Sequence, residues 1–418
     1  CHDFGVRGIR VAIGGLCVSL DIILVSVLLK YEGLNATELA ISESQERMAV
    51  VIDPKDEAEF LSYVKSENIE YSKTAQVCES GRLIMTFKGQ EVLNIKRSFI
   101  DTNGADKYAV VNVDCNRVPQ LGEAASSLSE YLRTEAKQLN ICSQKGLTEI
   151  FDNTIGASTV LMPYGGKHML TPSDVMASKI PTFGKDTKTV SLMSHGFDPE
   201  LCMKSPYLGA SDAVLSSVTK LVCAGADYQT IKLSFQEYFE KLKTDPVKWG
   251  KPFSALLGAL RIQTTLGISA IGGKDSKNGT YESLDVPPSL ISFGVAVTDI
   301  DHIVSNELKK SGSSLLLLRP KRTESGLVDL ESAKKMFESI HRAIQNKQIL
   351  TAKACGIGGP AISLMLSAFG NQIGAVINDE ISLALLTATD HTELLIETDN
   401  PNRLKSTDFD VIPFGKTV

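Results

Sequence analysis

Apolar residues recur at helical spacing in several segments of the chain. In 123–139 they form one stripe opposite Glu, Arg and Lys side chains, and they are Ala124, Leu128, Leu132, Ala136 and Leu139. This pattern is typical of an amphipathic helix on the surface of a domain. Helices are also predicted over 54–64, 209–223, 330–345 and 361–369.

Other segments favour strands. Residues 82–95 alternate between apolar and polar, which predicts two paired strands, and apolar runs at 49–52, 158–162, 290–297 and 315–318 predict further strands. The longest apolar run spans 16–29 and includes Asp21. Because a bilayer crossing needs about 20 apolar residues, this shorter run predicts a buried strand or helix and no membrane span.

Together these elements predict an α+β fold in which sheets are backed by helices. A chain of 418 residues is long enough for two or three domains. We expect one domain at 1–112, a connector at 113–150, a second domain at 151–320 and a third at 326–418. A polar joint at 319–326 separates the last two.

Two glycine-rich turns stand in the same relation to an apolar helix. Gly5 and Gly8 precede one such helix, and Gly356 and Gly359 precede another. The numbering offset is 351 for both pairs (356 minus 5 and 359 minus 8). This spacing predicts a duplication in which 1–112 and 326–418 share one fold, although two glycine matches could also arise by chance.

Charge and cysteine content narrow the function. Lys and Arg number 43 against 49 Asp and Glu, a net charge of −6, which argues against nucleic acid or an anionic membrane as a partner. Eight cysteines without a CxxC pair predict reduced thiols and a cytoplasmic location. The six histidines show no metal-ligand spacing, and no GxSxG motif supports a serine hydrolase.

Three segments carry candidate chemistry, each with a simpler alternative. Asp3 beside a glycine-rich turn could bind Mg²⁺ near phosphate oxygens, or could cap a helix. The run 43–47 could contact a ligand before a strand, or form a solvated turn in which Arg47 pairs with an acidic neighbour. Residues 272–280 could form a flexible loop that holds phosphate through Lys274 and Asp275, or a polar hairpin.

Several motifs in this order resemble phosphoribosylformylglycinamidine synthase. They are CHDFG at 1–5, LAISESQERM at 39–48, LSFQEYF at 233–239, WGKPF at 249–253 and IGGKDS at 271–276. The resemblance covers almost the whole chain and implies a ligase of purine biosynthesis. Such an enzyme converts formylglycinamide ribonucleotide, ATP and glutamine-derived ammonia into the amidine, with Mg²⁺ as metal cofactor, as part of a glutamine amidotransferase.

The resemblance also implies an architecture of duplicated aminoimidazole ribonucleotide synthetase-like domains. Residues 1–112 then correspond to the second domain of a first half, 151–320 to the first domain of a second half, and 326–418 to a truncated last domain. The first synthase domain and the glutaminase domain would lie outside this chain. As an internal fragment, the chain would then lack glutaminase activity and is expected to be inactive alone.

By motif, the resemblance implies that Asp3 binds Mg²⁺ and that Glu43, Ser44 and Gln45 contact the ribonucleotide. It places Lys274 and Asp275 near the nucleotide or a domain interface. Departures occur at Arg7 and Gly15, where the family carries Gly and Glu. In the later half, the turn at 356–359 lacks the family's acidic residue, and Ser216 or Ser217 stands where the family has a metal-binding Asn. A second nucleotide site is therefore not expected.

Two other functions stay open. One is another ATP-dependent enzyme of the same superfamily, acting on a different amide, carboxylate or selenide. The other is a noncatalytic scaffold, in which the second half is a pseudo-symmetric partner for the first. For residues 151–418 we favour the scaffold over catalysis.

Overall fold

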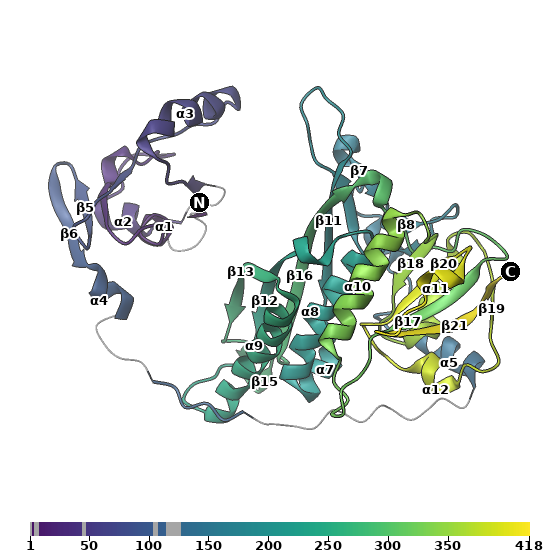
Figure 1. The fold of residues 1–418 in the computed structure, drawn as a ribbon. Helices are drawn as coiled ribbons and strands as arrows, with labels where there is room; N and C mark the ends of the chain where they lie inside the picture. Colours follow the sequence, from purple (N-terminus) through teal and green to yellow (C-terminus); the bar gives the residue numbers. More distant parts are fainter. Residues whose placement is uncertain (1, 4–7, 44–46, 103–107, 114–126) are drawn as a thin grey trace. The chain divides into compact units, whose positions relative to one another are not determined.

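A computed structural model describes residues 2–3, 8–43, 47–102, 108–113 and 127–418 of the chain (Figure 1). The chain divides into two compact units, Cys1–Tyr108 and Ala109–Val418. None of the described helices is long and apolar enough to cross a membrane.

The first unit is a small α+β domain. Its sheets have the strand orders β1-β3 and β4-β2-β5-β6. The elements are β1 (His2–Asp3), α1 (Gly8–Ala12), β2 (Leu20–Ile23), α2 (Ala36–Ile41), β3 (Met48–Ala49), α3 (Glu57–Ser66), β4 (Ala75–Val77), β5 (Arg82–Phe87), β6 (Gln90–Lys96) and α4 (Arg97–Thr102).

Fewer residues of the apolar run 16–29 are buried in the core of this unit than the sequence predicts. In β2 the buried residues alternate with exposed ones, so Leu20 and Ile22 face the core while Asp21 and Ile23 face away. Val18, in the same run, is 70% exposed. The run therefore forms a half-buried strand, because a strand presents successive side chains to opposite faces.

The second unit is larger and contains the remaining elements. Before the last sheet these are α5 (Leu128–Glu135), α6 (Lys145–Thr148), β7 (Thr159–Leu161), β8 (Tyr164–Gly165), β9 (Thr171–Pro172), β10 (Met176–Lys179), β11 (Thr189–Gly196), α7 (Pro199–Lys204), α8 (Pro206–Cys223), β12 (Lys232–Tyr238), α9 (Pro246–Leu266), β13 (Ser269–Ser276), β14 (Thr280–Tyr281), β15 (Leu284–Asp285) and β16 (Ser289–Asp299). After them come β17 (Ser314–Arg319), α10 (Leu330–Gln345), β18 (Thr351–Ala354), α11 (Gly359–Phe369), β19 (Ala375–Ile377), α12 (Leu383–Thr387), β20 (Leu394–Thr398) and β21 (Asp410–Thr417).

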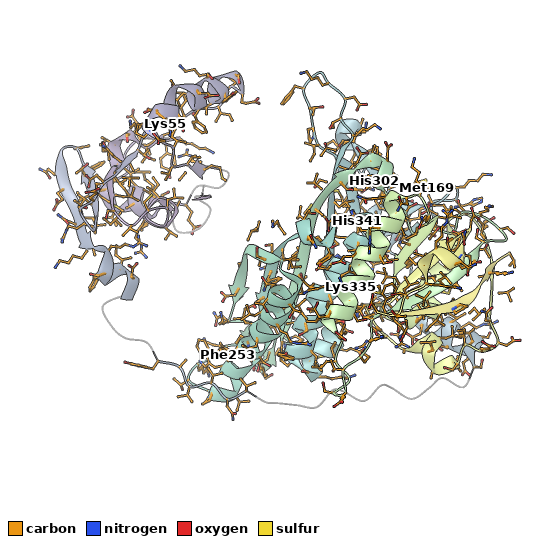
Figure 2. All side chains as sticks on the ribbon, viewed as in Figure 1. Lys55, Met169, Phe253, His302, Lys335 and His341 are labelled. Carbon is orange, nitrogen blue, oxygen red and sulfur yellow. The ribbon has the colours of Figure 1, made fainter. Side chains whose placement is uncertain are left out.

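A six-stranded sheet, of order β13-β12-β16-β11-β10-β7, is covered by helices on one face only. Helix α8 packs on β11 and β16, with α9 and α10 beside it (Figure 1). The long helices start at strong caps, because Ser205, Asp245 and Asp329 each accept backbone N–H bonds at a helix start. On α9 the outer side also carries exposed apolar residues such as Phe253 (Figure 2).

The other face of this sheet is apolar and exposed. The antiparallel register aligns Met176 with Met193 and Met193 with Val295, and all three are exposed. Phe293 and Val297 lie two residues to either side of Val295 on β16, so they share its face, and both are also exposed. A contiguous apolar face of this kind is typical of a surface that another protein segment covers.

The five-stranded sheet, of order β18-β20-β17-β21-β19, is covered on both faces. Leu316 and Leu318 of β17 join the large core with α8 and α10, while Leu315 and Leu317 join a smaller core with α11. We expected residues 315–318 in the domain at 151–320, but β17 pairs with β20 and β21. An apolar run identifies a buried strand but carries no information about its partners, which explains the difference.

The strand registers support the predicted duplication. His2 pairs with Ala49 and Asp3 with Met48 in the first unit, as Lys353 pairs with Leu395 and Ala354 with Leu394 in the second. The numbering offset is 351 on the first strand (353 minus 2) and 346 on the second (395 minus 49). Antiparallel β2 and β4 likewise correspond to β19 and β21. We call residues 2–77 the first repeat and 351–418 the second repeat.

A glycine fixes the same close contact in both repeats. Gly8 has φ +66° and Gly359 has φ +68°, a region that favours glycine. A Cβ on Gly8 would lie 2.6 Å from the carbonyl oxygen of Ser42, just after α2. A Cβ on Gly359 would lie 2.7 Å from the carbonyl oxygen of Ala388, just after α12. Each glycine therefore lets a turn pack directly on the end of the next helix.

We predict that Gly359→Ala lowers the free energy of unfolding by about 2 to 4 kcal/mol, because it adds a backbone clash to the strain of a positive φ. The matched control is Gly326→Ala, where φ is +81° but no atom lies within 4 Å of the added Cβ. We expect that control to cost only about 1 kcal/mol. Denaturant unfolding followed by the fluorescence of Trp249, the chain's single tryptophan, measures both. Equal losses would refute the contact.

Candidate functional site

The first repeat brings the predicted metal and substrate segments together. β1 carries Asp3 and pairs with β3, so Asp3 lies opposite Met48, at the end of the run SESQERM. Gly8 packs against Ile41 and Ser42, immediately before Glu43. Three segments that are separate in sequence therefore converge on one end of α1 and α2.

The side chains at this point are described only in part. Glu43 is exposed after the end of α2, whereas Ser44 and Gln45 lie outside the described residues, and so does the side chain of Asp3. Arg47 donates a 2.6 Å hydrogen bond to the carbonyl oxygen of Leu28. This bond ties the run to the segment that follows β2. Glu46, one of the two partners that the simpler interpretation gave Arg47, lies outside the described residues.

The second repeat places charged side chains at the corresponding positions. Lys353, the counterpart of His2, contacts Asp174 with 2.7 Å between Nζ and Oδ1, and its side chain is only 6% exposed. Lys220 of α8 donates to the carbonyl oxygen of His195 at 2.8 Å. Burial lowers the pKa of Lys220, and Asp174 opposes that effect. The position that Asp3 holds is occupied by Ala354.

His391 stands at the position that corresponds to Gln45, by the offset of 346. Its Nδ1 lies 2.8 Å from Oδ2 of Asp212 on α8, and both side chains are largely buried. Burial lowers the pKa of His391, but the negative charge of Asp212 so close to the ring outweighs it and raises the pKa above its usual value. The two repeats thus differ in the chemistry of the same two strands.

Two backbone N–H groups in the glycine turn of the second repeat donate hydrogen bonds to other groups of the protein. The N–H of Gly358 donates to Oγ1 of Thr389 at 3.3 Å, and that of Gly359 donates to the carbonyl oxygen of Gly356 at 2.8 Å. Ile141 covers the turn, since a Cβ on Gly358 would lie 3.3 Å from its Cδ1. Such a turn has little left to offer a phosphate, which needs free N–H groups.

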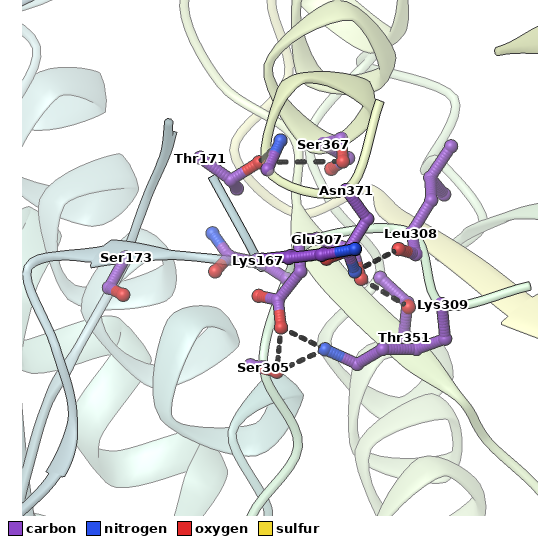
Figure 3. A network of polar contacts seen from close by, with 12 residues as sticks. Lys167, Thr171, Ser173, Ser305, Glu307, Leu308, Lys309, Thr351, Ser367 and Asn371 are labelled. Carbon is purple, nitrogen blue, oxygen red and sulfur yellow. Dashed lines mark hydrogen bonds and ion pairs between the residues drawn. The ribbon is translucent and has the colours of Figure 1, made fainter. Parts of the chain in front are cut away.

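A network of polar contacts holds the start of β18 and the C-terminal end of α11, at the other end of these elements from the glycine turn. Oγ1 of Thr351, the first residue of β18, donates to the carbonyl oxygen of Glu307 at 2.8 Å (Figure 3). Asn371, which follows α11, donates to the carbonyl oxygen of Leu308 at 2.7 Å, and Thr171 donates to Leu366 at 2.6 Å. The network ties hairpin β8–β9 and the segment 305–309 to α11.

Lys274 and Asp275 lie on strand β13, away from the charged residues of the second repeat. The segment 272–276 is part of edge strand β13, paired in parallel with β12, so the flexible loop predicted there is wrong for these residues. Lys274 lies 5.4 Å from the ring centre of Tyr238, and Asp275 pairs with Lys277. Because β13 and β10 are four strands apart, about 19 Å at usual spacing, the structure does not bring these residues to Asp174.

Ser217 faces the sheet, whereas Ser216 lies one turn from Asp212 and one turn from Lys220 on the same side of α8. Ser217 lies 2.9 Å from Ser292 of β16, and both serines of α8 are fully buried. Sequence reasoning missed the residues that do meet here, His391 and Asp212 above all. No local spacing could reveal them, because they stand in distant parts of the sequence. The internal repeat seen in the sequence, with its offset of 351, does not align His391 with Gln45, and the offset of 346 that does so comes from the strand register.

Comparison with known proteins first identifies the fold class of the chain. A family model for AIR synthase related protein, C-terminal domain, matches residues 1–88. Two solved structures of PurL from Thermotoga maritima share the fold. The one complexed with ATP has a TM-score of 0.66 at 18% identity, covering 100% of this chain and 63% of that one. The one complexed with FGAR has a TM-score of 0.67 at 17% identity, covering 99% and 61%. The chain has an AIR synthase-like fold.

The sequence comparison is more specific. Phosphoribosylformylglycinamidine synthase subunit PurL of Methanocaldococcus jannaschii is 22% identical over 413 residues, which cover 90% of this chain and 53% of the relative. The chain is similar in sequence to this synthase subunit over most of its length, as its motifs suggested. It spans about half the length of the curated relatives it matches.

The carboxyl group of Glu393 predicts a pH dependence of stability. Glu393 is fully buried, and burial raises its pKa from 4.5 to about 8, against the effect of Arg319, whose Nη2 lies 3.0 Å away. The folded chain therefore keeps a proton that the unfolded chain loses above pH 4.5. The contribution of this carboxyl group to the free energy of unfolding is therefore highest at low pH, where both states carry this proton. It falls as the pH rises from 4.5 towards 8, because the unfolded state then releases the proton more readily than the folded state.

We predict that Glu393→Gln flattens this decline by about 1 to 3 kcal/mol between pH 5 and pH 8, because the amide cannot ionise. Denaturant unfolding at several pH values measures it. The control is Glu324→Gln, an exposed site that should follow the unmodified chain. If Glu393→Gln runs parallel to that control, the buried carboxyl does not cause the decline.

Proposed function

We propose that this chain forms part of an ATP-dependent ligase that converts formylglycinamide ribonucleotide to the amidine with ammonia derived from glutamine. The observation that carries the proposal is the convergence of β1, the Gly8 turn and the run after α2 in the first repeat. Homology to PurL and the likeness to structures complexed with ATP and with FGAR support it.

In this proposal the first repeat supplies contacts to the metal and the ribonucleotide. Asp3 would hold Mg²⁺, which when bound offsets negative charge on a transferring phosphoryl group. Carboxylate oxygen is a ligand type that Mg²⁺ prefers. Glu43, Ser44 and Gln45 offer hydroxyl, amide and carboxylate groups without a Lys, so they suit the ribonucleotide's hydroxyl and amide groups better than a triphosphate.

The reaction assigned by resemblance transfers phosphate from ATP to the amide oxygen of the substrate, after which ammonia displaces the phosphate. Lys274 and Asp275 stay proposed nucleotide or interface residues. Neighbours on a strand point to opposite faces, and the even-numbered residues of β12, to which Lys274 pairs, share the exposed apolar face. We therefore favour the interface role for Lys274.

The second repeat is proposed to act as a noncatalytic scaffold. Ala354 provides no carboxylate where the first repeat has Asp3, and the nearby Lys353 is paired with Asp174. The N–H groups of its glycine turn are bonded within the protein. A scaffold needs a stable fold and no ligand, which fits these substitutions.

The proposed partners are the synthase domain and the glutaminase domain that this chain does not include, the latter as the source of ammonia. The apolar face of the six-stranded sheet, formed by Met176, Met193, Phe293, Val295 and Val297, is the proposed docking face for the synthase domain. We expect the chain alone to have no glutaminase or synthase activity. A cytoplasmic location stays a prediction from the cysteine content.

We predict that Asp3→Asn slows synthase turnover about 100-fold or more in an enzyme completed with the missing domains, because a carboxylate at a metal site is worth several kcal/mol in the transition state. The melting temperature should hardly change, since Asn has nearly the same size and shape as Asp and leaves the pairing of β1 with β3 intact. Steady-state kinetics and a melting curve decide it. Asp21→Asn, at an exposed position of β2, is the control. Unchanged turnover in Asp3→Asn would refute the metal-binding role of Asp3.

We predict that Gln45→Ala raises the Michaelis constant for the ribonucleotide about 2- to 13-fold in the same enzyme, with little effect on that for ATP. One lost hydrogen bond between neutral groups is worth about 0.5 to 1.5 kcal/mol. Initial rates with each substrate varied in turn measure the effect. The control is Gln76→Ala on exposed β4. A rise for ATP alone would contradict the assignment, and equal rises would indicate a disrupted loop.

A further inference from the structure

Three side chains from distant parts of the second unit meet beside the glycine turn of the second repeat. Asp198, Asp212 and His391 each offer one donor atom, and these atoms all lie within 4.8 Å of one another. We propose that they bind a single divalent transition-metal ion, with Zn²⁺ the best match. This site would be separate from the proposed Mg²⁺ at Asp3, and the inference does not depend on the proposed function.

Each ligand is held by the fold. Asp198 caps α7 by accepting the N–H of Leu201 at one carboxylate oxygen, 3.0 Å away, which leaves the second oxygen available. Asp212 lies in the second turn of α8, among residues packed in the core. His391 precedes β20, and Gly356 makes room for its ring, because a Cβ there would lie 3.1 Å from Cδ2.

One buried atom points to a ligand more directly. Oδ2 of Asp212 is buried and has no hydrogen-bond partner among the described residues, although Nδ1 of His391 is only 2.8 Å away. The side chain of His391 is 9% exposed. A divalent ion among the donor atoms of Asp198, Asp212 and His391 would supply the partner that this oxygen lacks. A buried carboxylate oxygen without a partner is otherwise costly.

The charged groups around the site favour the binding of a cation. The site is surrounded by the carboxylates of Asp174, Asp198 and Asp212 and the ammonium groups of Lys220 and Lys353. Lys353 contacts Asp174, and Lys220 is close enough to interact with Asp174, Asp212 and His391. With a neutral His391, the three carboxylates and two ammonium groups have a net charge of −1. The alternative to a bound metal ion is therefore a proton on His391, which would make the cluster neutral and form an ion pair with Asp212.

The donor set selects the kind of metal. Imidazole nitrogen suits Zn²⁺ and its neighbours in the first transition series, whereas Mg²⁺ and Ca²⁺ prefer all-oxygen sites. Zn²⁺ accepts carboxylate oxygens as well and is stable with three protein ligands and one further position. Asp198 caps α7, Asp212 lies on α8, and His391 lies on the loop before β20. The ion would therefore join the helices packed on the six-stranded sheet to the five-stranded sheet.

The experiment uses the whole chain, stripped of metal with a chelator and titrated with Zn²⁺ alone in a calorimeter. We expect one saturable site per chain and a rise in melting temperature on binding. Co²⁺ used in place of Zn²⁺ should give the visible absorption of a low-symmetry site that contains a nitrogen ligand. Mg²⁺ should not compete at similar concentrations.

Variants locate the site. His391→Gln, which installs the residue found at the first repeat's counterpart, should weaken Zn²⁺ binding at least tenfold, since even partners of metal ligands matter by 10- to 100-fold. Asp198→Asn should also weaken binding while preserving the cap of α7, which keeps the test valid if His391→Gln folds poorly. His302→Gln, on the short helix after β16 (Figure 2), should bind as the unmodified chain does.

Two results would overturn the proposal. One is the absence of a saturable site at one Zn²⁺ per chain. The other is binding that Asp198→Asn and His391→Gln leave as tight as His302→Gln does. Either result would return the cluster to an ion pair between a protonated His391 and Asp212.

Discussion

The close approach of a glycine backbone to the end of the following helix is the constraint on which both repeats depend. At Gly8 and Gly359 the positive φ turns the chain into a helix, and the missing Cβ lets the turn rest on carbonyl groups after α2 and α12. This contact fixes where the next strand starts. The same strand registers in β1–β3 and β18–β20 follow from it, although few side chains are shared.

Much of the secondary structure could be predicted from local patterns. The helix over 330–345 coincides with α10, whose buried residues include Leu330, Met336 and Ile340 at helical spacing. Residues 209–223 lie within α8, and 82–95 form β5 and β6. These segments carry a strong periodicity and few glycines, so their local and tertiary preferences agree.

The predictions that differ from the structure share a different physical cause. Gly272 and Gly273 predicted a loop, but β13 is held by its parallel ladder with β12, which needs no side chain at those positions. The partners of β17 are β20 and β21, which follow it only after α10, β18, α11, β19 and α12. The cluster around His391 joins α7, α8 and the loop before β20. Pairing and clustering over such separations leave no periodic trace in the sequence.

The difference between the repeats follows from the cost of buried charge. A site built to bind a metal and a phosphorylated substrate contains polar groups that need partners when the ligand is absent. In the second repeat, Lys353 and Asp174 partner each other, and Lys220 is satisfied by a backbone carbonyl. Removal of one member of such a pair would leave the other charge buried and uncompensated, a large penalty. The glycine contact and the strand register survive in this repeat because the fold requires them, while the polar positions have been free to change in compensating pairs. In this cluster, Oδ2 of Asp174 and Oδ2 of Asp212 are buried without a hydrogen-bond partner among the described residues. Of the two, Asp212 lies beside the donor atoms of Asp198 and His391, and it is therefore there that an ion is expected.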